Sequence, residues 1–197
     1  RSDCHQFYRW AIRRGMLTAD PTEQVDPPRL RQRQATPLSD DELRAAILRA
    51  NGDQRRAVML GAYAGLRMSE IAALDMRDVH RDRRLLVVRD GKGGRDAVVP
   101  LADELAAVLP DIGAAVGYPH GQAVGAAVRR LFRACGISAR PHDLRHTFGT
   151  AVARRSGGNM VLVAKLLRHS SVTTSQRYVA WDPAGAEVVA GLYGDAA

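Results

Sequence analysis

The chain has 197 residues, of which 46% are hydrophobic and 25% are charged, as in ordinary globular proteins. Its formal net charge of +8 at pH 7 favours a polyanionic partner, with nucleic acid ahead of an anionic membrane surface. The two cysteines, Cys4 and Cys135, form no C-x-x-C motif, which argues against a disulfide framework or a zinc site and fits a reducing cytoplasm. The longest apolar run, AVMLGAYAGL, is too short to span a bilayer.

The first residues predict a helix that belongs to an upstream domain. Residues 3–16 carry aromatic and aliphatic side chains at helical spacing, but no partner helix precedes them. The chain also begins without Met, so we expect residues 1–19 to be the last helix of a truncated domain. Residues 20–37 are rich in proline and arginine and nearly free of large apolar side chains, which is typical of a basic interdomain linker.

A second domain is predicted over residues 38–181. Ser39 and Glu42 form a capping-box pattern, which marks the start of its first helix. Apolar residues at helical spacing predict helices at residues 40–50, 53–64, 68–75, 102–109, 121–135, 142–155 and 159–168.

The apolar pattern changes period between residues 79 and 101. Two β-branched and aliphatic runs, LLVVR (85–89) and AVVPL (97–101), flank the glycine-rich sequence DGKGGRD. This arrangement predicts a hairpin in a small sheet. The expected fold class is therefore mainly α with a small antiparallel β-sheet.

The last segment predicts two more short helices. Thr173 and Gln176 form a second capping-box pattern, which places Tyr178 within the first two turns of a helix. An apolar face at residues 184–193 predicts a helix within a tail of residues 182–197. Whether this tail docks on its own domain or on a neighbouring protomer is left open by the sequence.

Arginine is used almost to the exclusion of lysine. Of 29 Lys and Arg residues only Lys92 and Lys165 are lysine, and Lys92 lies at the tip of the predicted hairpin. The surrounding GKGGR lacks the G-x-x-x-x-G-K-[ST] spacing of a phosphate loop, so we predict no nucleotide site there. A lysine retained at this tip indicates either a need for an ammonium group or a chance survival, and the sequence alone leaves both open.

Six residues are candidates for chemistry, and each also has an ordinary structural explanation. Taken singly, Arg67 suits a helix end, Lys92 a solvated turn and His142 the entry to a helix. Arg145 suits a local bridge, His169 a helix C-terminus and Tyr178 a core aromatic position.

Taken together, these residues have a family likeness. The motifs AGLRMSE, PHDLRHTFGT and LLRHSSVTTSQRYV closely resemble the three signature boxes of the tyrosine recombinases, or phage integrase family. The resemblance covers roughly residues 38–180, and the first residues resemble the final helix of that family's core-binding domain. One position departs from the pattern, because the family usually has Gly before the second histidine and this chain has Arg168. Glycine suits a left-handed helix end and arginine does not.

The resemblance implies the catalytic-domain fold of the DNA breaking–rejoining enzymes and strand exchange without a metal, ATP or other cofactor. Arg67 and Arg145 would each grip the scissile phosphate through paired hydrogen bonds. Tyr178 would attack that phosphate and form a covalent 3′-phosphotyrosine, which preserves the phosphodiester energy for rejoining.

The remaining candidates would transfer protons and orient the phosphate. The resemblance implies that Lys92 protonates the leaving 5′ oxygen, since an ammonium group gives up a proton far more readily than a guanidinium. It also implies that His142 takes the phenol proton and that His169 hydrogen-bonds the phosphate. Beside the motifs, we expect Glu70 to orient a neighbouring helix or histidine and His146 to be structural.

The implied partner is double-stranded DNA at attachment or resolution sites. A homotetramer would act on the DNA, the free fragment would be a monomer or weak oligomer, and accessory DNA-bending proteins are a further implied partner. Candidate backbone contacts are Arg29, Arg31 and Arg33 of the linker and Arg95 of the hairpin. The implied location is the cytoplasm of a bacterium, with the nucleoid, for a bacterial or phage-encoded protein that does not bind membranes.

Three other functions are weighed against recombination. A type IB topoisomerase would use the same chemistry but relax DNA without pairing two sites, and the motif spacing is closer to that of integrases. A non-catalytic DNA-binding regulator on this fold would not need every catalytic position, and all are present. A histidine-based phosphodiesterase would need the histidines but not Tyr178.

Overall fold

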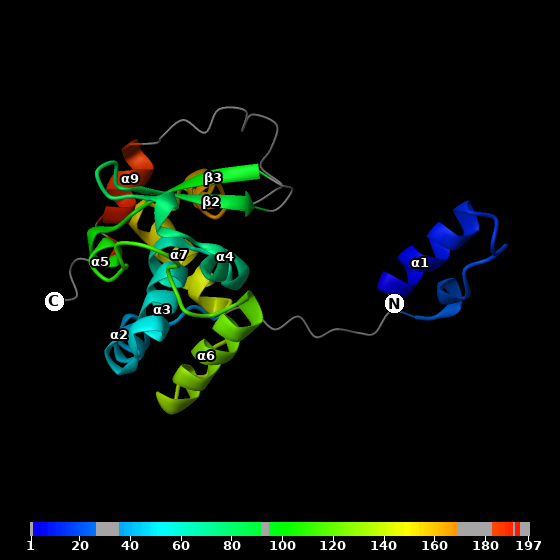
Figure 1. Cartoon of the computed structure of the whole chain (residues 1–197), viewed down its shortest axis with the longest axis horizontal. Helices are drawn as coiled ribbons and strands as arrows, with labels where there is room; N and C mark the ends of the chain where they lie inside the picture. The colour runs from blue at the N-terminus through cyan, green and yellow to red at the C-terminus, as the bar shows by residue number, and fades with distance from the viewer. Residues whose placement is uncertain (1, 27–35, 92–94, 169–182, 191, 194–197) are drawn as a thin grey trace. The chain divides into compact units, whose positions relative to one another are not determined.

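The computed structural model describes residues 2–26, 36–91, 95–168, 183–190 and 192–193. The chain divides into two compact units, residues 1–34 and residues 35–197. The first unit contains α1 (Ser2–Arg13) and the short 3-10 helix η1 (Pro21–Gln24) (Figure 1). His5 Nδ1 lies 2.5 Å from Asp20 Oδ2, so the start of the segment expected to be linker folds back on α1. In no helix among the described residues is there an apolar stretch long enough to cross a membrane.

The second unit is mainly helical and carries one small sheet, which confirms the expected fold class. Its helices are α2 (Asp40–Arg49), α3 (Gly52–Ala64), α4 (Met68–Ala73), η2 (Met76–Asp78), α5 (Asp103–Ala106), α6 (Gly121–Ala134), α7 (Asp143–Arg155), α8 (Met160–Leu166) and α9 (Pro183–Ala190). Its strands, antiparallel in the order β1-β2-β3, are β1 (Val79–His80), β2 (Leu85–Gly91) and β3 (Arg95–Pro100). The sheet lies at one end of this unit and α6 at the other (Figure 1).

Local signals place the helix ends close to where they were predicted. The Ser39 hydroxyl accepts a hydrogen bond from the Glu42 N–H at 3.2 Å, and the Glu42 carboxylate accepts one from the Ser39 N–H at 2.8 Å. This reciprocal pair is the predicted capping box at the start of α2. The main difference is α5, which is shorter than the predicted helix at 102–109 because the chain turns before Pro110.

The predicted hairpin is present. Leu86 pairs with Val99 across β2 and β3, and both side chains are buried together with Val88, so one face of the sheet packs on the core. β2 continues two residues past its apolar run, whereas β3 begins two residues before its run and ends at Pro100. The tip, residues 92–94, lies outside the described residues.

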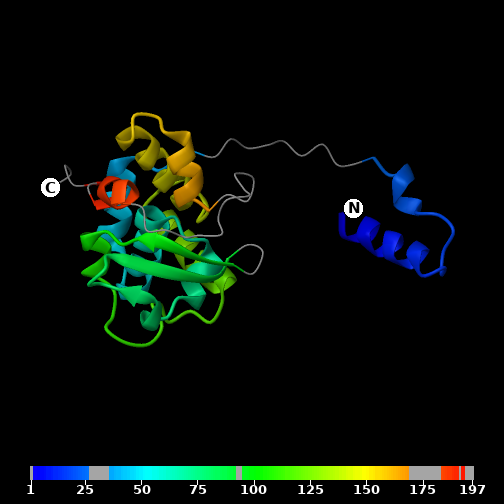
Figure 2. The same ribbon diagram turned by 90° about the horizontal axis from the view of Figure 1, so that it is seen from above.

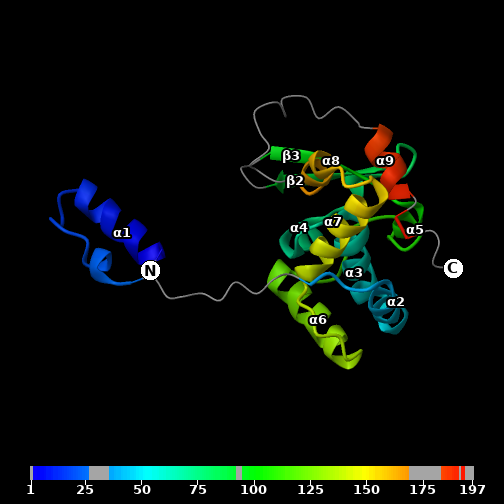
Figure 3. The ribbon, with the colours of Figure 1, turned by 180° about the vertical axis from the view of Figure 1, so that it is seen from behind.

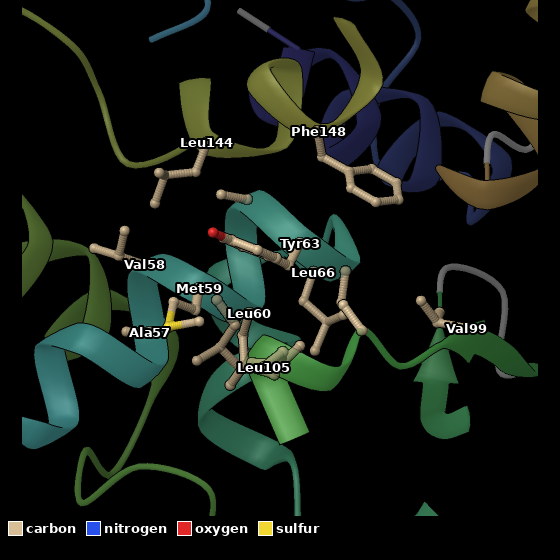
Figure 4. Packing of buried hydrophobic residues seen from close by; sticks show 14 of the residues in the cluster. Ala57, Val58, Met59, Leu60, Tyr63, Leu66, Val99, Leu105, Leu144 and Phe148 are labelled. Carbon is tan, nitrogen blue, oxygen red and sulfur yellow. The ribbon is translucent and has the colours of Figure 1, made fainter. Parts of the chain in front are cut away.

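Helix α3 is the centre of the core, with every residue from 57 to 64 buried. Leu144 and Phe148 of α7 point toward it (Figure 4). A Cβ atom added to Gly61 would lie 2.9 Å from the Leu144 Cβ, so the glycine lets the two helices pack closely. Gly65 ends α3 at φ +62°, and a Cβ atom there would lie 2.6 Å from the Phe148 ring. The close contact of α3 and α7 therefore depends on two glycines.

Helix α9 packs on its own domain, against both α7 and β3 (Figures 2 and 3). Val189 and Leu192 are buried in the core, and the Tyr193 hydroxyl donates a hydrogen bond to the Ala62 carbonyl at 2.9 Å. The Tyr193 ring centroid lies 4.4 Å from that of Tyr63. Burial raises the pKa of the Tyr193 phenol, which therefore stays neutral as a hydrogen-bond donor.

Candidate active site

Arg67 lies in the turn between α3 and α4 and forms the N-cap of α4. Its backbone N–H donates to Glu70 Oε2 at 2.8 Å, and its Nη1 donates to Glu70 Oε1 at 2.6 Å. The Arg67 side chain is 28% exposed, whereas that of Glu70 is only 7% exposed. Glu70 therefore holds Arg67 from the protein side and leaves part of its guanidinium open to solvent.

Arg145 lies in the first turn of α7 and is buried, with 4% of its surface exposed. Its Nη1 donates to the Gly65 carbonyl and its Nη2 donates to the Leu167 carbonyl. Burial, together with the charges of Arg168 and Arg67, lowers the pKa of Arg145 to about 9. The group is therefore still cationic at neutral pH, and its two carbonyl partners fix its position.

Arg168 follows α8 at a φ of +54°, in the left-handed region that favours glycine. Its Nη2 donates to Glu70 Oε2 at 2.7 Å and to the Gly65 carbonyl at 3.2 Å. The sequence singled out this position for its backbone but not for its side chain. The structure adds Arg168 to the cluster formed by Arg67, Glu70 and Arg145.

The three arginines of this cluster interact electrostatically with the single carboxylate of Glu70. Burial acts to raise the pKa of Glu70, but the charge of Arg168 and the hydrogen bonds and charge of Arg67 outweigh it and hold the pKa below its usual range. Glu70 is therefore a carboxylate at neutral pH. It caps the start of α4, as a group that orients a neighbouring helix would, but its side-chain partners are the guanidiniums of Arg67 and Arg168. Three guanidinium groups against one carboxylate leave this cluster positive, an arrangement suited to binding an anion.

His142 immediately precedes α7, and its ring lies near the cluster. Its centroid is 5.2 Å from that of His146, at an interplanar angle of 81°. Burial, His146 and the charge of Arg145 lower the pKa of His142. The imidazole is therefore neutral at pH 7 and can accept a proton.

An open groove of about 780 Å3 runs beside His142. It is lined on one side by Met68 and Ser69 of α4. Three exposed basic residues line the groove and were not among the predicted contacts, because one lies on α6 and two lie in loops, and only tertiary packing brings them to one groove. They are His120, Arg129 and Arg140.

The structure brings together three of the six predicted site residues, Arg67, His142 and Arg145. The other three lie outside the described residues, as do the predicted linker contacts and the second capping box. These are Lys92, His169, Tyr178, Arg29, Arg31, Arg33, Thr173 and Gln176. Arg95 begins β3, and only its backbone is described.

Comparison with known proteins identifies the family of this chain. The profile described as the phage integrase family matches residues 37–116 and 120–184. A tyrosine recombinase from Thermosipho africanus is 29% identical over 195 residues, which cover 90% of this chain and 69% of the relative. The tyrosine recombinase XerC from Mycobacterium sp. (strain KMS) is 32% identical, with 87% of this chain and 67% of the relative covered.

Solved structures have the same fold. The integrase from mycobacterium phage Brujita aligns with a TM-score of 0.73 at 24% identity, covering 96% of this chain and 69% of that one. A lambda integrase dimer bound to a COC′ core site aligns with a TM-score of 0.68 at 16% identity, covering 92% and 74%. The family profile covers well over half of the sequence. The chain therefore belongs to the phage integrase family, as a site-specific recombinase of the tyrosine type.

Proposed function

We propose that this enzyme cuts and rejoins double-stranded DNA at specific sites through a covalent 3′-phosphotyrosine at Tyr178, without a metal or ATP. The observation that carries the proposal is the convergence of Arg67 and Arg145. Arg67 caps the start of α4 and Arg145 lies in α7, yet Arg67 is hydrogen-bonded to Glu70 and Arg145 to the Gly65 carbonyl, and Arg168 donates to both of these acceptors. Two cations held this way can bind one phosphate of the DNA backbone.

The chemistry needs such a cluster because an anionic phosphodiester repels nucleophiles. An enzyme must supply on the order of 20 kcal/mol of transition-state stabilisation for phosphate-ester cleavage. Guanidinium groups neutralise the charge that grows on the non-bridging oxygens. Because Arg145 is buried and bound to two carbonyls, it does not need to reorganise when the reaction starts.

The remaining candidate residues of the site carry out the proton transfers. As the bond between the Tyr178 oxygen and phosphorus forms, His142 takes the phenol proton, which suits its lowered pKa and neutral form. As the bond from phosphorus to the 5′ oxygen breaks, Lys92 protonates the leaving oxygen. His169 hydrogen-bonds a non-bridging oxygen. Rejoining reverses these steps with a new 5′ hydroxyl, so no external energy source is consumed.

Duplex DNA at attachment or resolution sites is the proposed partner. Lambda integrase has been solved as a dimer on a core site and as a tetramer on a Holliday junction. We assign this enzyme the same kind of assembly, with accessory DNA-bending proteins at its sites, and place it with the bacterial nucleoid. Its net charge of +8 and the basic groove support contact with DNA phosphates. The linker arginines would extend that contact.

The decisive test uses nicked half-site DNA in the presence of EDTA. The protein should form an adduct that survives denaturing electrophoresis, and Tyr178→Phe should lose the adduct while retaining DNA binding. Strand exchange between two sites would then separate a recombinase from a type IB topoisomerase, which would only relax supercoiled DNA. An adduct that persists in Tyr178→Phe would contradict the proposal, and binding without any adduct would favour the non-catalytic regulator.

A further inference from the structure

Arg168 occupies a backbone conformation that is unfavourable for it. Its φ of +54° lies in the left-handed region, where a Cβ atom crowds the following carbonyl. Its side chain is 9% exposed, and its Nε is buried with no hydrogen-bond acceptor among the described residues. Backbone strain, loss of hydration and an unpaired donor all oppose this placement. A specific set of contacts must offset them.

Those contacts join the end of α8 to the turn after α3. The Arg168 Nη2 reaches both Glu70 Oε2, at 2.7 Å, and the Gly65 carbonyl, at 3.2 Å. Arg145 spans the same joint, from the Gly65 carbonyl to the Leu167 carbonyl. Two guanidinium groups therefore fasten α8 to the turn that carries Arg67, immediately before the segment that begins at residue 169.

The Glu70 carboxylate is shared between two arginines. Its Oε1 accepts from Arg67 Nη1, while its Oε2 accepts from the Arg67 N–H and from Arg168 Nη2. Without Arg168 the full negative charge of Glu70 would act on Arg67 and offset its charge. With Arg168 present, Glu70 still fixes the position of Arg67, but the cluster keeps a larger positive charge.

We propose that Arg168 is a positioning residue of the phosphate site, which shares Glu70 with Arg67 and thereby keeps Arg67 both oriented and electrostatically available to the scissile phosphate. The inference rests on the proposed function and adds a third guanidinium to its charge balance. In the pentacoordinate transition state the phosphate carries an additional negative charge, which a cluster of three cations and one carboxylate can match.

The test compares Arg168→Gly with a matched control, Arg84→Gly. Arg84 is the other non-glycine residue of positive φ in the described part of the chain, at +51°, and it forms an exposed ion pair with Asp103 at 2.5 Å. Both variants remove the backbone strain of a non-glycine residue at positive φ, and both remove one positive charge. We expect Arg168→Gly to slow single-turnover adduct formation on saturating half-site DNA by about tenfold or more with an unchanged Kd, and Arg84→Gly to leave the rate unchanged.

A second substrate distinguishes a loss of charge neutralisation from a general structural defect in Arg168→Gly. In a half-site with an uncharged methylphosphonate at the scissile position, the charge to be neutralised is smaller, so the deficit of Arg168→Gly should shrink. Arg168→Lys, which keeps the charge, should recover part of the rate on the normal phosphate. A parent-like rate for Arg168→Gly, or an equal deficit on both substrates, would overturn the proposal.

A readout independent of cleavage is the coupling between Arg168 and Glu70 in urea unfolding. The single variants Arg168→Gly and Glu70→Gln and the double variant form a cycle, and the shared ion pair predicts non-additive effects. Additive effects would overturn the proposal even if the protein cuts DNA. If the parent protein forms no adduct, the proposed function fails, and non-additivity would then support only the shared carboxylate.

Discussion

Arg145 and Gly65 are joined by a hydrogen bond from the arginine Nη1 to the glycine carbonyl, which ties the first turn of α7 to the turn after α3. This contact places a buried cation beside Arg67 and Glu70. It also satisfies a backbone carbonyl at the end of α3. The same interaction thus contributes to both the stability of the domain and the proposed phosphate site.

Arg145→Lys tests this double role. A lysine keeps the charge but cannot reach both carbonyls, and a buried acceptor that loses its donor costs about 1–3 kcal/mol of the free energy of unfolding. Adduct formation should fall by about 10²–10³-fold, as when one preorganised donor is lost. Urea unfolding and single-turnover kinetics measure the two effects. Arg154→Lys, at an exposed position near the end of α7, should change neither.

Gly65→Ala tests the approach of α3 and α7. The new Cβ would both strain a φ of +62° and lie 2.6 Å from the Phe148 ring, so we expect a loss of about 2–4 kcal/mol. Gly113 is the matched control, because it has a φ of +81° with nothing within 4 Å of an added Cβ. Gly113→Ala should therefore show the backbone strain alone. Equal losses for the two variants in urea unfolding would show that Phe148 makes no steric demand.

The pKa of Glu70 predicts a pH dependence of stability. A carboxyl group whose native pKa is lowered stabilises the fold above its unfolded pKa of about 4.3 and loses that contribution as pH falls through the native value. Glu70→Gln should therefore be less stable than the parent at pH 7, with a difference that narrows in strongly acidic solution. Unfolding at a series of pH values measures this.

His142 predicts a pH dependence of the reaction. Burial, His146 and Arg145 lower its pKa from about 6.5, so the base is already deprotonated at neutral pH. The rate of adduct formation should rise as pH increases through that lowered value and then level off below pH 7. In His142→Gln the rise should vanish and the plateau should drop by about 10²–10⁴-fold. A rise that persists in the variant would assign the base to another residue.

The groove beside His142 predicts a salt effect. If Arg129 and Arg140 contact DNA phosphates, each replacement by alanine should weaken binding at low salt and reduce the slope of log K against log salt by about one. Electrophoretic mobility shifts at several salt concentrations measure the slope. Arg84→Ala, beside a separate groove lined by Asp82 and Glu187, should leave the slope unchanged.

Local chemistry was enough to predict most elements of this domain. The Ser39–Glu42 box marks the start of α2, and the two apolar runs around the glycine-rich tip predict β2 and β3. These signals act over a few residues, between an N-cap and the next turn or along one strand. For the same reason the family likeness of the motifs could be seen without coordinates.

Packing alone decided which side chains contact one another. Arg168 stood out in the sequence as a poor residue for a left-handed helix end, but nothing near it in the chain indicates that its guanidinium reaches Glu70, 98 residues away. That contact exists because α3 and α7 pack closely at Gly61 and Gly65 and α8 follows α7 back to the same turn. The sequence by itself determined where helices and strands begin and which motifs they carry. The tertiary structure decided which charges share a carboxylate, because contacts between distant residues depend on how whole helices pack.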